Sequence, residues 1–127
     1  MDGLHAAGVV FVDDVLAVSA FYRAVTGMVV LHAGDGYAVL GSDGFQLTVH
    51  ALPVPGGDGS GTYPTRHDSY VKLCFPVRSL AEARATAAEF EGELWPADRE
   101  WEARGFRACD GRDPEGNVFQ LRESAHA

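Results

Sequence analysis

The three residues Phe-Gln-Leu occur twice in this chain, at 45–47 and at 119–121, and each time they follow a turn that contains glycine. Such a repeat predicts two copies of one structural unit within 127 residues. The two copies also align elsewhere, because several equivalent residues lie 65 positions apart (for example, 77 minus 12). These pairs are Val12 with Val77, Asp14 with Ser79, and Gly27 with Gly92. The repeat therefore spans almost the whole chain.

The first copy has the pattern strand, helix, then three strands. A valine-rich run at 6–12 predicts a buried strand. The next segment, 15–26, predicts a helix that begins after Asp14 and ends at Gly27, residue types that favour the two ends of a helix. Three further strands are expected at 28–33, 36–41 and 45–50.

The second copy follows a stretch rich in proline and glycine that neither a helix nor a central strand tolerates. Its helix should begin after Ser79, with Glu82 completing a capping box, and end at Gly92. Gln46 and Gln120 are 74 positions apart (120 minus 46), so this copy has nine more residues between its helix and its last strand (74 minus 65). Strands are expected at 70–77 and within 92–97, 105–110 and 117–123.

These patterns predict an α+β fold of two βαβββ modules within one domain, 1–127. The first module covers about 6–52, the linker 53–68, and the second module about 69–123.

Alternation along the last strand of each module separates apolar from polar side chains. In the first module Phe45, Leu47 and Val49 share one face, and Gln46, Thr48 and His50 share the other. In the second module Phe119 and Leu121 are opposed by Val118, Gln120 and Arg122. The apolar faces should lie under the helices. The polar faces then either line a binding surface or simply face solvent.

The charge of the chain excludes one class of partner. With 18 acidic residues against 10 Lys and Arg, its formal charge is -8, which makes nucleic acid an unsuitable ligand. A neutral or cationic small molecule suits this field better. The N-terminal segment lacks an export or membrane signal. Cys74 and Cys109 do not have CxxC spacing, so we expect them to be reduced thiols. We therefore expect a cytoplasmic protein without membrane contact.

Three segments resemble the vicinal oxygen chelate superfamily: "VDDVLAVSAFYRAVTGM" at 12–28, "VRSLAEARATAAEFEGEL" at 77–94 and "DPEGNVFQLRE" at 113–123. That superfamily includes glyoxalase I, extradiol dioxygenases, fosfomycin-resistance enzymes and bleomycin-resistance proteins. The resemblance implies mixed sheets that curl into a cup, with the helices on the outer face. It also implies a homodimer that builds each cup from two modules.

The resemblance places the metal positions of the superfamily on Ala7, Gln46, Lys72 and Gln120. Alanine cannot coordinate, a lysine ammonium repels a cation, and neutral amides are weak donors. We therefore expect no metal cofactor. The alternative is one Zn, Ni or Fe ion held by His5, Gln46, His50 and Gln120 in a lyase, isomerase or dioxygenase.

Without a metal, the resemblance points to members that sequester drugs, and it suggests a cup for a small aromatic or cationic molecule. Tryptophan rings in the extra segment offer stacking surfaces, although Trp95 could equally pack in the core and Trp101 cover a dimer seam. Lys72 could equally pair with a carboxylate.

No nucleophile has a neighbouring base, so no catalytic residue is assigned. A scaffold whose cup is filled by its own side chains is a third possibility. The expected ligand-binding residues are Gln46, Thr48, His50, Lys72, Trp95, Trp101, Phe106, Arg107 and Gln120.

Overall fold

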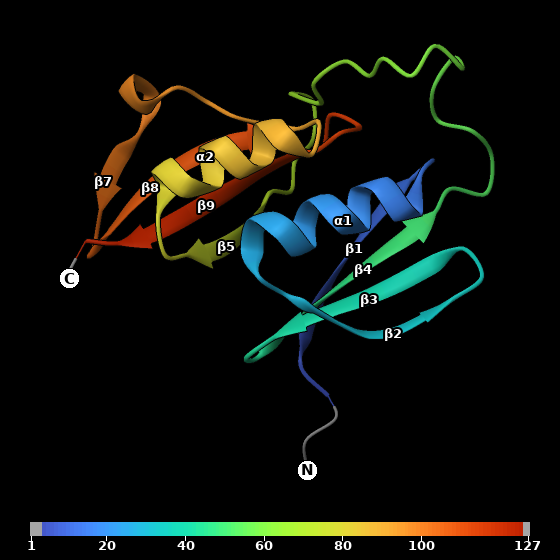
Figure 1. The fold of residues 1–127 in the computed structure, drawn as a ribbon, viewed down its shortest axis with the longest axis horizontal. Helices are drawn as coiled ribbons and strands as arrows, with labels where there is room; N and C mark the ends of the chain where they lie inside the picture. Colours follow the sequence, from blue (N-terminus) through green and yellow to red (C-terminus); the bar gives the residue numbers. More distant parts are fainter. Residues whose placement is uncertain (1–3, 126–127) are drawn as a thin grey trace.

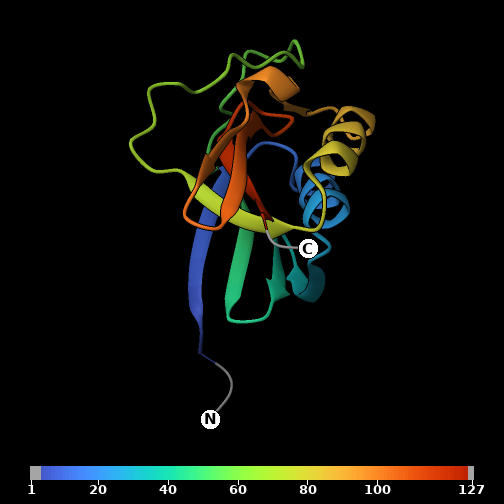
Figure 2. The ribbon, with the colours of Figure 1, turned by 90° about the vertical axis from the view of Figure 1, so that its left-hand side faces the viewer.

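The computed structural model describes residues 4–125 and confirms the α+β architecture. Two helices lie on the same side of two mixed sheets (Figures 1 and 2). The first sheet has the order β1-β4-β3-β2, and the second has the order β5-β9-β8-β6, with β7 also paired to β8. The elements are β1 (Ala6–Val12), α1 (Val15–Thr26), β2 (Val29–Gly34), β3 (Tyr37–Ser42), β4 (Phe45–Ala51), β5 (Leu73–Val77), α2 (Leu80–Glu89), β6 (Glu93–Leu94), β7 (Trp101–Ala103), β8 (Phe106–Arg112) and β9 (Val118–Ser124).

Helix α1 has the bounds that its capping residues predict. The Asp14 side chain accepts a hydrogen bond from the Ala17 backbone N–H at 3.0 Å, which satisfies one of the free donors of the first turn. Gly27 ends the helix in the left-handed conformation, with φ of 78°, and its N–H donates to the Arg23 carbonyl. The chain runs from β1 through α1, β2 and β3 to β4. Strand β4 then lies beside β1 as its parallel partner.

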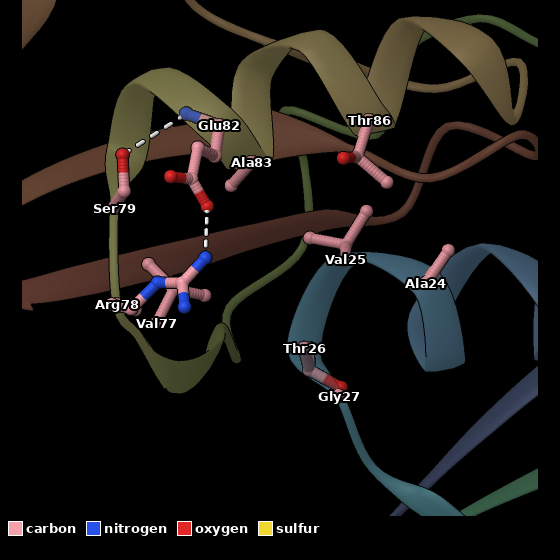
Figure 3. Close-up of a pocket in the computed structure, with 10 residues that line it drawn as sticks. All are labelled: Ala24, Val25, Thr26, Gly27, Val77, Arg78, Ser79, Glu82, Ala83 and Thr86. Atoms are coloured by element: carbon pink, nitrogen blue, oxygen red, sulfur yellow. Dashed lines mark hydrogen bonds and ion pairs between the residues drawn. The ribbon is translucent and has the colours of Figure 1, made fainter.

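One hydrophobic core joins the two modules. Phe21 and Tyr22 of α1 contact Phe119 and Phe75 of the second sheet, with ring centroids 5.7 Å apart in each pair. Helices α1 and α2 also pack together, and Val25 faces α2 across their contact (Figure 3). Helix α1 therefore covers its own sheet and part of the neighbouring module. The two modules share one apolar interior.

The turn at 113–117 explains the D-P-x-G-N pattern. The Asp113 carboxylate is fully buried and accepts hydrogen bonds from the Tyr22 hydroxyl at 2.8 Å and from the Asn117 backbone N–H at 3.0 Å. Burial raises the pKa of Asp113, while the hydrogen bonds from Asn117 and Tyr22 act in the opposite direction. This turn of the second module is thus bonded to the helix of the first.

A second carboxylate of the same turn reaches the beginning of α1. The two Glu115 oxygens accept from the backbone N–H groups of Asp13 and Asp14, each at 2.7 Å. An anion at this position satisfies donors that a helix end leaves free and complements the helix dipole. In the second module, the Glu123 carboxylate accepts in a similar way from the Leu80 N–H at the beginning of α2. Carboxylates of the second module, one from the turn before β9 and one from β9 itself, therefore bond to the N-terminal ends of both helices.

Two expected boundaries in the second module were wrong. Strand β5 begins at Leu73, and the residues from 70 to 72 precede it without regular structure. Helix α2 ends at Glu89, and the left-handed residue is Glu91, with φ of 68°, instead of Gly92. The Gly92 N–H donates to the Ala87 carbonyl, completing a Schellman-type end. Gly92 is required for close packing, because a Cβ there would collide with the Phe21 ring.

The extra segment of the second module interrupts one edge strand. β6 pairs with Arg112 and Gly111 of β8, and β7 pairs with residues 106–108 of the same strand. The residues between them leave the sheet through a short 3-10 turn at Ala97–Arg99. The expected strand within 92–97 is therefore only Glu93–Leu94, and β7 was not expected. The insertion divides the strand in two without adding a new layer.

Replacing Glu91 by glycine should stabilise the protein by about 1 kcal/mol, because glycine adopts a positive φ without the steric cost that other residues incur. Urea unfolding followed by circular dichroism measures the change. Glu89→Gly is the matched control: it lies within α2 and should destabilise the protein by about 1 kcal/mol. Equal effects of the two replacements would contradict the assignment of the helix end.

Candidate functional site

The open face of each sheet, the one opposite its helix, is the candidate binding surface. In β4, Leu47 and Val49 are fully buried under α1, while Gln46 and Thr48 lie on the open face. Ala7 of β1 pairs directly with Gln46. The expectation that the apolar residues lie under the helix and the polar ones opposite is therefore confirmed for the first module. Its open face remains largely accessible.

Four rings cross the open face of the first sheet in a row. Phe11 contacts His50 at 5.6 Å between centroids, and His50 stacks on Tyr37 at 6.3 Å with an interplanar angle of 18°. His32 then contacts Tyr37 at 5.4 Å. Sequence reasoning singled out His50 but missed Phe11, Tyr37 and His32. The register that pairs residue 37 with residue 50 and residue 11 with residue 50 brings them together.

The open face of the second sheet carries a connected polar cluster. Gln120 is only 6% exposed, and its amide donates to Asp110 at 3.3 Å, while its oxygen accepts from Arg122 Nε at 2.7 Å. The Lys72 ammonium lies 2.7 Å from the other Asp110 oxygen. The Arg122 guanidinium covers the Phe106 ring at 4.5 Å. Both hydrogen-bonding ends of Gln120 are therefore engaged within the protein.

The strand register places Cys74 opposite Gln120. The resemblance to the superfamily had aligned Lys72 with Ala7, which lies opposite Gln46 in the first module. That alignment was wrong for the pairing, because the two modules differ by two residues in how their first and last strands pair. Lys72 precedes β5 and reaches the cluster through its long side chain. The exposed Cys74 thiol lies 3.5 Å from Arg122 Nη2.

The other residues of the expected ligand set divide between two environments. Trp101 is 41% exposed and pairs with Ala108, which is itself opposite Arg122, so Trp101 belongs to the open face. Trp95 packs against the core. Arg107 alternates with Ala108 in β8 and forms ion pairs with Glu100 and Glu102. Trp95 and Arg107 therefore do not join the open-face set.

The part of the chain that the structure describes contains no cluster of metal-ligating side chains. Within residues 4–125 no three His, Cys, Asp or Glu side chains come together in a metal-binding arrangement. His5 precedes β1, whereas His50 lies beside Phe11 near the other end of that strand. A strand rises by about 3.3 Å per residue, so five to six residues separate the two histidines by roughly 16–20 Å. They cannot bind one ion within a single chain.

A groove lies between β1 and the segment that leads into β5. Its volume is 590 Å³, and its walls come from residues 7–11 of β1, from Val71 and Leu73, from Arg66 of the linker and from Ser69 just after it. Val9 and Phe11 are half exposed, and Val71 is more exposed still. Large apolar side chains on an unpaired edge strand are typical of a contact surface.

The linker is held against the first module by one carboxylate. Asp13 accepts from the backbone N–H groups of Gly56 at 2.7 Å and Gly57 at 2.9 Å, and from the Tyr63 hydroxyl at 2.8 Å. Arg112 holds the linker from the second module, through the Tyr63 carbonyl and the Thr65 hydroxyl, each at 2.8 Å. The linker therefore has a defined path along the molecule despite its loop composition.

Paired βαβββ modules with open sheet faces define the architecture of the vicinal oxygen chelate superfamily, and the comparisons agree. Residues 9–122 match the family model of a glyoxalase-like domain, so the chain belongs to the glyoxalase-like family. No curated protein has a sequence that matches this chain. None of the helices in the described part is long and apolar enough to cross a membrane.

Several solved structures have a similar fold. One is a glyoxalase/bleomycin resistance protein/dioxygenase family enzyme from Burkholderia phytofirmans, with a TM-score of 0.69 and 18% identity over 94% of this chain and 97% of that one. Another is a glyoxalase/bleomycin resistance protein from Albidiferax ferrireducens, with a TM-score of 0.68 and 18% identity over 95% and 98%. The fosfomycin resistance protein FosX from Mesorhizobium loti has a TM-score of 0.64 and 12% identity over 99% and 95%. At these identities the likeness concerns the fold.

The contact between Tyr63 and Asp13 should make linker docking depend on pH. Backbone donation from Gly56, followed by the Tyr63 bond, lowers the pKa of Asp13 below 3.8, and hydrogen bonding to Asp13 raises the pKa of Tyr63 from 10.0 to about 12. Because docking lowers the pKa of Asp13, the Asp13 carboxylate stabilises the docked linker above pH 3.8. This contribution is lost as the pH falls further. Because docking raises the pKa of Tyr63, the Tyr63 phenol stabilises the docked linker below pH 10.0. This contribution is lost as the pH rises toward 12.

Tyrosinate absorbance measures this directly, as the difference between the wild type and Tyr63→Phe. The difference absorbance should titrate with a pKa of about 12, and Asp13→Asn should lower this pKa toward 10.0. A Tyr63 titration at its ordinary value in the wild type would disprove the docking contact.

Proposed function

We propose that this protein binds a small planar aromatic molecule on its open faces without a metal ion and without breaking a bond, and so acts by sequestration. The observation that carries the proposal is the state of the cluster around Gln120. At the position on the last strand where metal-dependent relatives place a ligand, this chain has the buried Gln120 amide bonded to Arg122, and the neighbouring Lys72 ammonium is paired with Asp110. Two cations occupy the region where such relatives would hold a third.

The chemistry of the individual donors supports the same reading. Ala7 has no donor atom, and the Gln120 oxygen already accepts a charge-assisted hydrogen bond. Binding a divalent ion there would require breaking that bond and placing the ion beside the Arg122 guanidinium. The cost of bringing these charges together favours a site that is free of metal.

Ring surfaces support an aromatic ligand. Phe11, His50 and Tyr37 present faces and edges on the first sheet, and Trp101 presents its ring on the second. Stacking on such rings contributes to binding beyond the buried area. Lys72 and Arg122 outnumber Asp110 in the cluster, so the local charge favours a neutral or anionic aromatic molecule over a cationic one, despite the net charge of -8.

We propose further that the protein is a homodimer in which each binding cup combines the open face of one module with that of its partner's other module. The exposed apolar edge around Val9, Phe11 and Val71 supports this arrangement, because it would otherwise remain in water. Both cysteines are free thiols, which suits a cytoplasmic location.

Elemental analysis of the untagged protein after dialysis against Zn²⁺, Ni²⁺ and Fe²⁺ should find no stoichiometric metal. A variant that combines Ala7→His, Gln46→Glu, Cys74→His and Gln120→Glu is the positive control, since it supplies imidazole and carboxylate donors at the paired positions of both modules and should retain a metal. About one metal per chain in the wild type would overturn the sequestration proposal and favour a metal-dependent enzyme.

Tryptophan fluorescence tests the aromatic ligand. Anilinonaphthalene sulfonate and the cation proflavine serve as planar probes of opposite charge. The proposal predicts saturable quenching, with tighter binding of the anionic probe, and Trp101→Ala should weaken that binding about tenfold through loss of stacking. Trp95→Phe is the matched control and should leave the affinity unchanged, because Trp95 packs against the core. Equal effects of the two variants would contradict the assignment of the open face.

Sedimentation equilibrium tests the dimer. Val9→Asp places a charge on the apolar edge and should convert the dimer to a monomer, whereas Val54→Asp, also on an exposed valine but in the linker, should leave the mass unchanged. A wild-type monomer would contradict the shared cup and leave each open face to bind ligand alone.

A further inference from the structure

A second concave site lies on the helix side of the first sheet, away from the open faces. Helix α1 packs on β3 and β4, and β2 at the edge of the sheet is exposed along its whole length. Between one side of α1 and the β2–β3 hairpin this leaves a trough of 540 Å³. Its position on the helix side follows from Val30, which lines the trough and pairs with Leu40, a core residue under α1.

The walls of the trough are mainly apolar. Val15, Leu16 and Ala20 come from α1, and Val30 and Ala33 come from β2. Leu16 is 84% exposed although it is a large aliphatic side chain in the first turn of an ordered helix. A volume between about 300 and 1,000 Å³ with apolar walls is typical of a small-molecule site. The trough therefore has the size and surface to bind an acyl chain or a comparable apolar body.

Ser19 contributes an unsatisfied polar group to this trough. Its side chain is only 7% exposed, and its Oγ is the one buried side-chain N or O atom in residues 4–125 without a hydrogen-bond partner. A serine within a helix commonly bonds to the carbonyl four residues before it, and Ser19 does not. Buried hydroxyls are rarely left unpaired, so this one calls for a partner that the chain does not supply.

Arg23 supplies the charge. It is the only charged side chain among the residues that line the trough, and no acidic residue within 4–125 forms an ion pair with it. Ser19 and Arg23 are four residues apart in α1, so they lie one turn apart on the same side of the helix. A hydroxyl and a guanidinium placed in this way can both donate to one carboxylate.

We propose that this trough is a binding site for an apolar monocarboxylate of the fatty-acid type. The carboxylate accepts from Arg23 and Ser19, and the apolar body lies along Val15, Leu16 and Val30. Charge complementarity selects this ligand over an amine, and the apolar walls select it over a sugar or a phosphate. The site is separate from the open faces, so it does not depend on the proposed sequestration function.

Calorimetric titration with decanoate, decanol and decylamine tests the proposal on the full chain. Decanoate should bind, and decanol and decylamine should bind at least tenfold more weakly. Arg23→Met keeps the length of the side chain and removes the charge, so it should weaken decanoate binding at least tenfold. Failure of decanoate to bind, or an unchanged affinity in Arg23→Met, would overturn the proposal.

Ser19→Ala gives a signature that a purely structural role would not. Removing an unpaired buried hydroxyl should raise the melting temperature of the free protein, and it should also weaken decanoate binding several-fold. A variant that lowers the melting temperature and leaves the affinity unchanged would show that the hydroxyl serves the fold, and would contradict its role as a ligand donor.

Blocking the trough provides a matched pair on one helix. Ala20→Phe fills the trough and should abolish decanoate binding, whereas Ala24→Phe lies outside it, in the wall of the groove between the two helices, and should retain binding (Figure 3). Sedimentation of both variants identifies the alternative occupant. A dimer that dissociates only in Ala20→Phe would show that a second copy of the chain covers the trough, which would overturn the ligand proposal.

Discussion

The hydrogen bond between the Tyr22 hydroxyl and the buried Asp113 carboxylate holds the two modules together. It connects α1 of the first module to the turn before the last strand of the second, inside a core that both modules share. Glu115, two residues further on, reinforces the connection by accepting hydrogen bonds from the backbone N–H groups of Asp13 and Asp14, just before α1. A buried carboxylate is costly unless its oxygens are fully bonded, and here the turn supplies the required donors.

This junction determines which surfaces remain for function. Because the modules meet through α1, α2 and the shared core, the open faces of both sheets are left for other contacts. The two faces differ in character. The first carries a row of rings with His50 near its centre, and the second carries an ion-paired cluster around Gln120. Gene duplication would produce two equivalent faces, and the difference between them follows from Arg122 and Asp110, which have no charged counterparts beside Gln46.

The fold could be predicted from sequence because its signals are local. Alternation placed Leu47 and Leu121 under the helices, and Asp14 and Gly27 bounded α1 as expected. The candidate site was predicted less completely because it depends on register between distant strands. Cys74 lies opposite Gln120 through a pairing shift of two residues, and Tyr37 meets His50 only in the folded sheet. Glu91, and not Gly92, adopts the left-handed conformation expected of glycine, while Gly92 lies where a Cβ would collide with the Phe21 ring.

A double-mutant cycle on Tyr22→Phe and Asp113→Asn tests the junction most directly, with free energies of unfolding measured in urea. Because the hydroxyl and the carboxylate are bonded across the module boundary, the two changes should be coupled by about 1–3 kcal/mol, and the chain should unfold in one transition. Additive effects, or separate transitions for the two modules, would show that the hydrogen bond between Tyr22 and Asp113 does not hold the modules together.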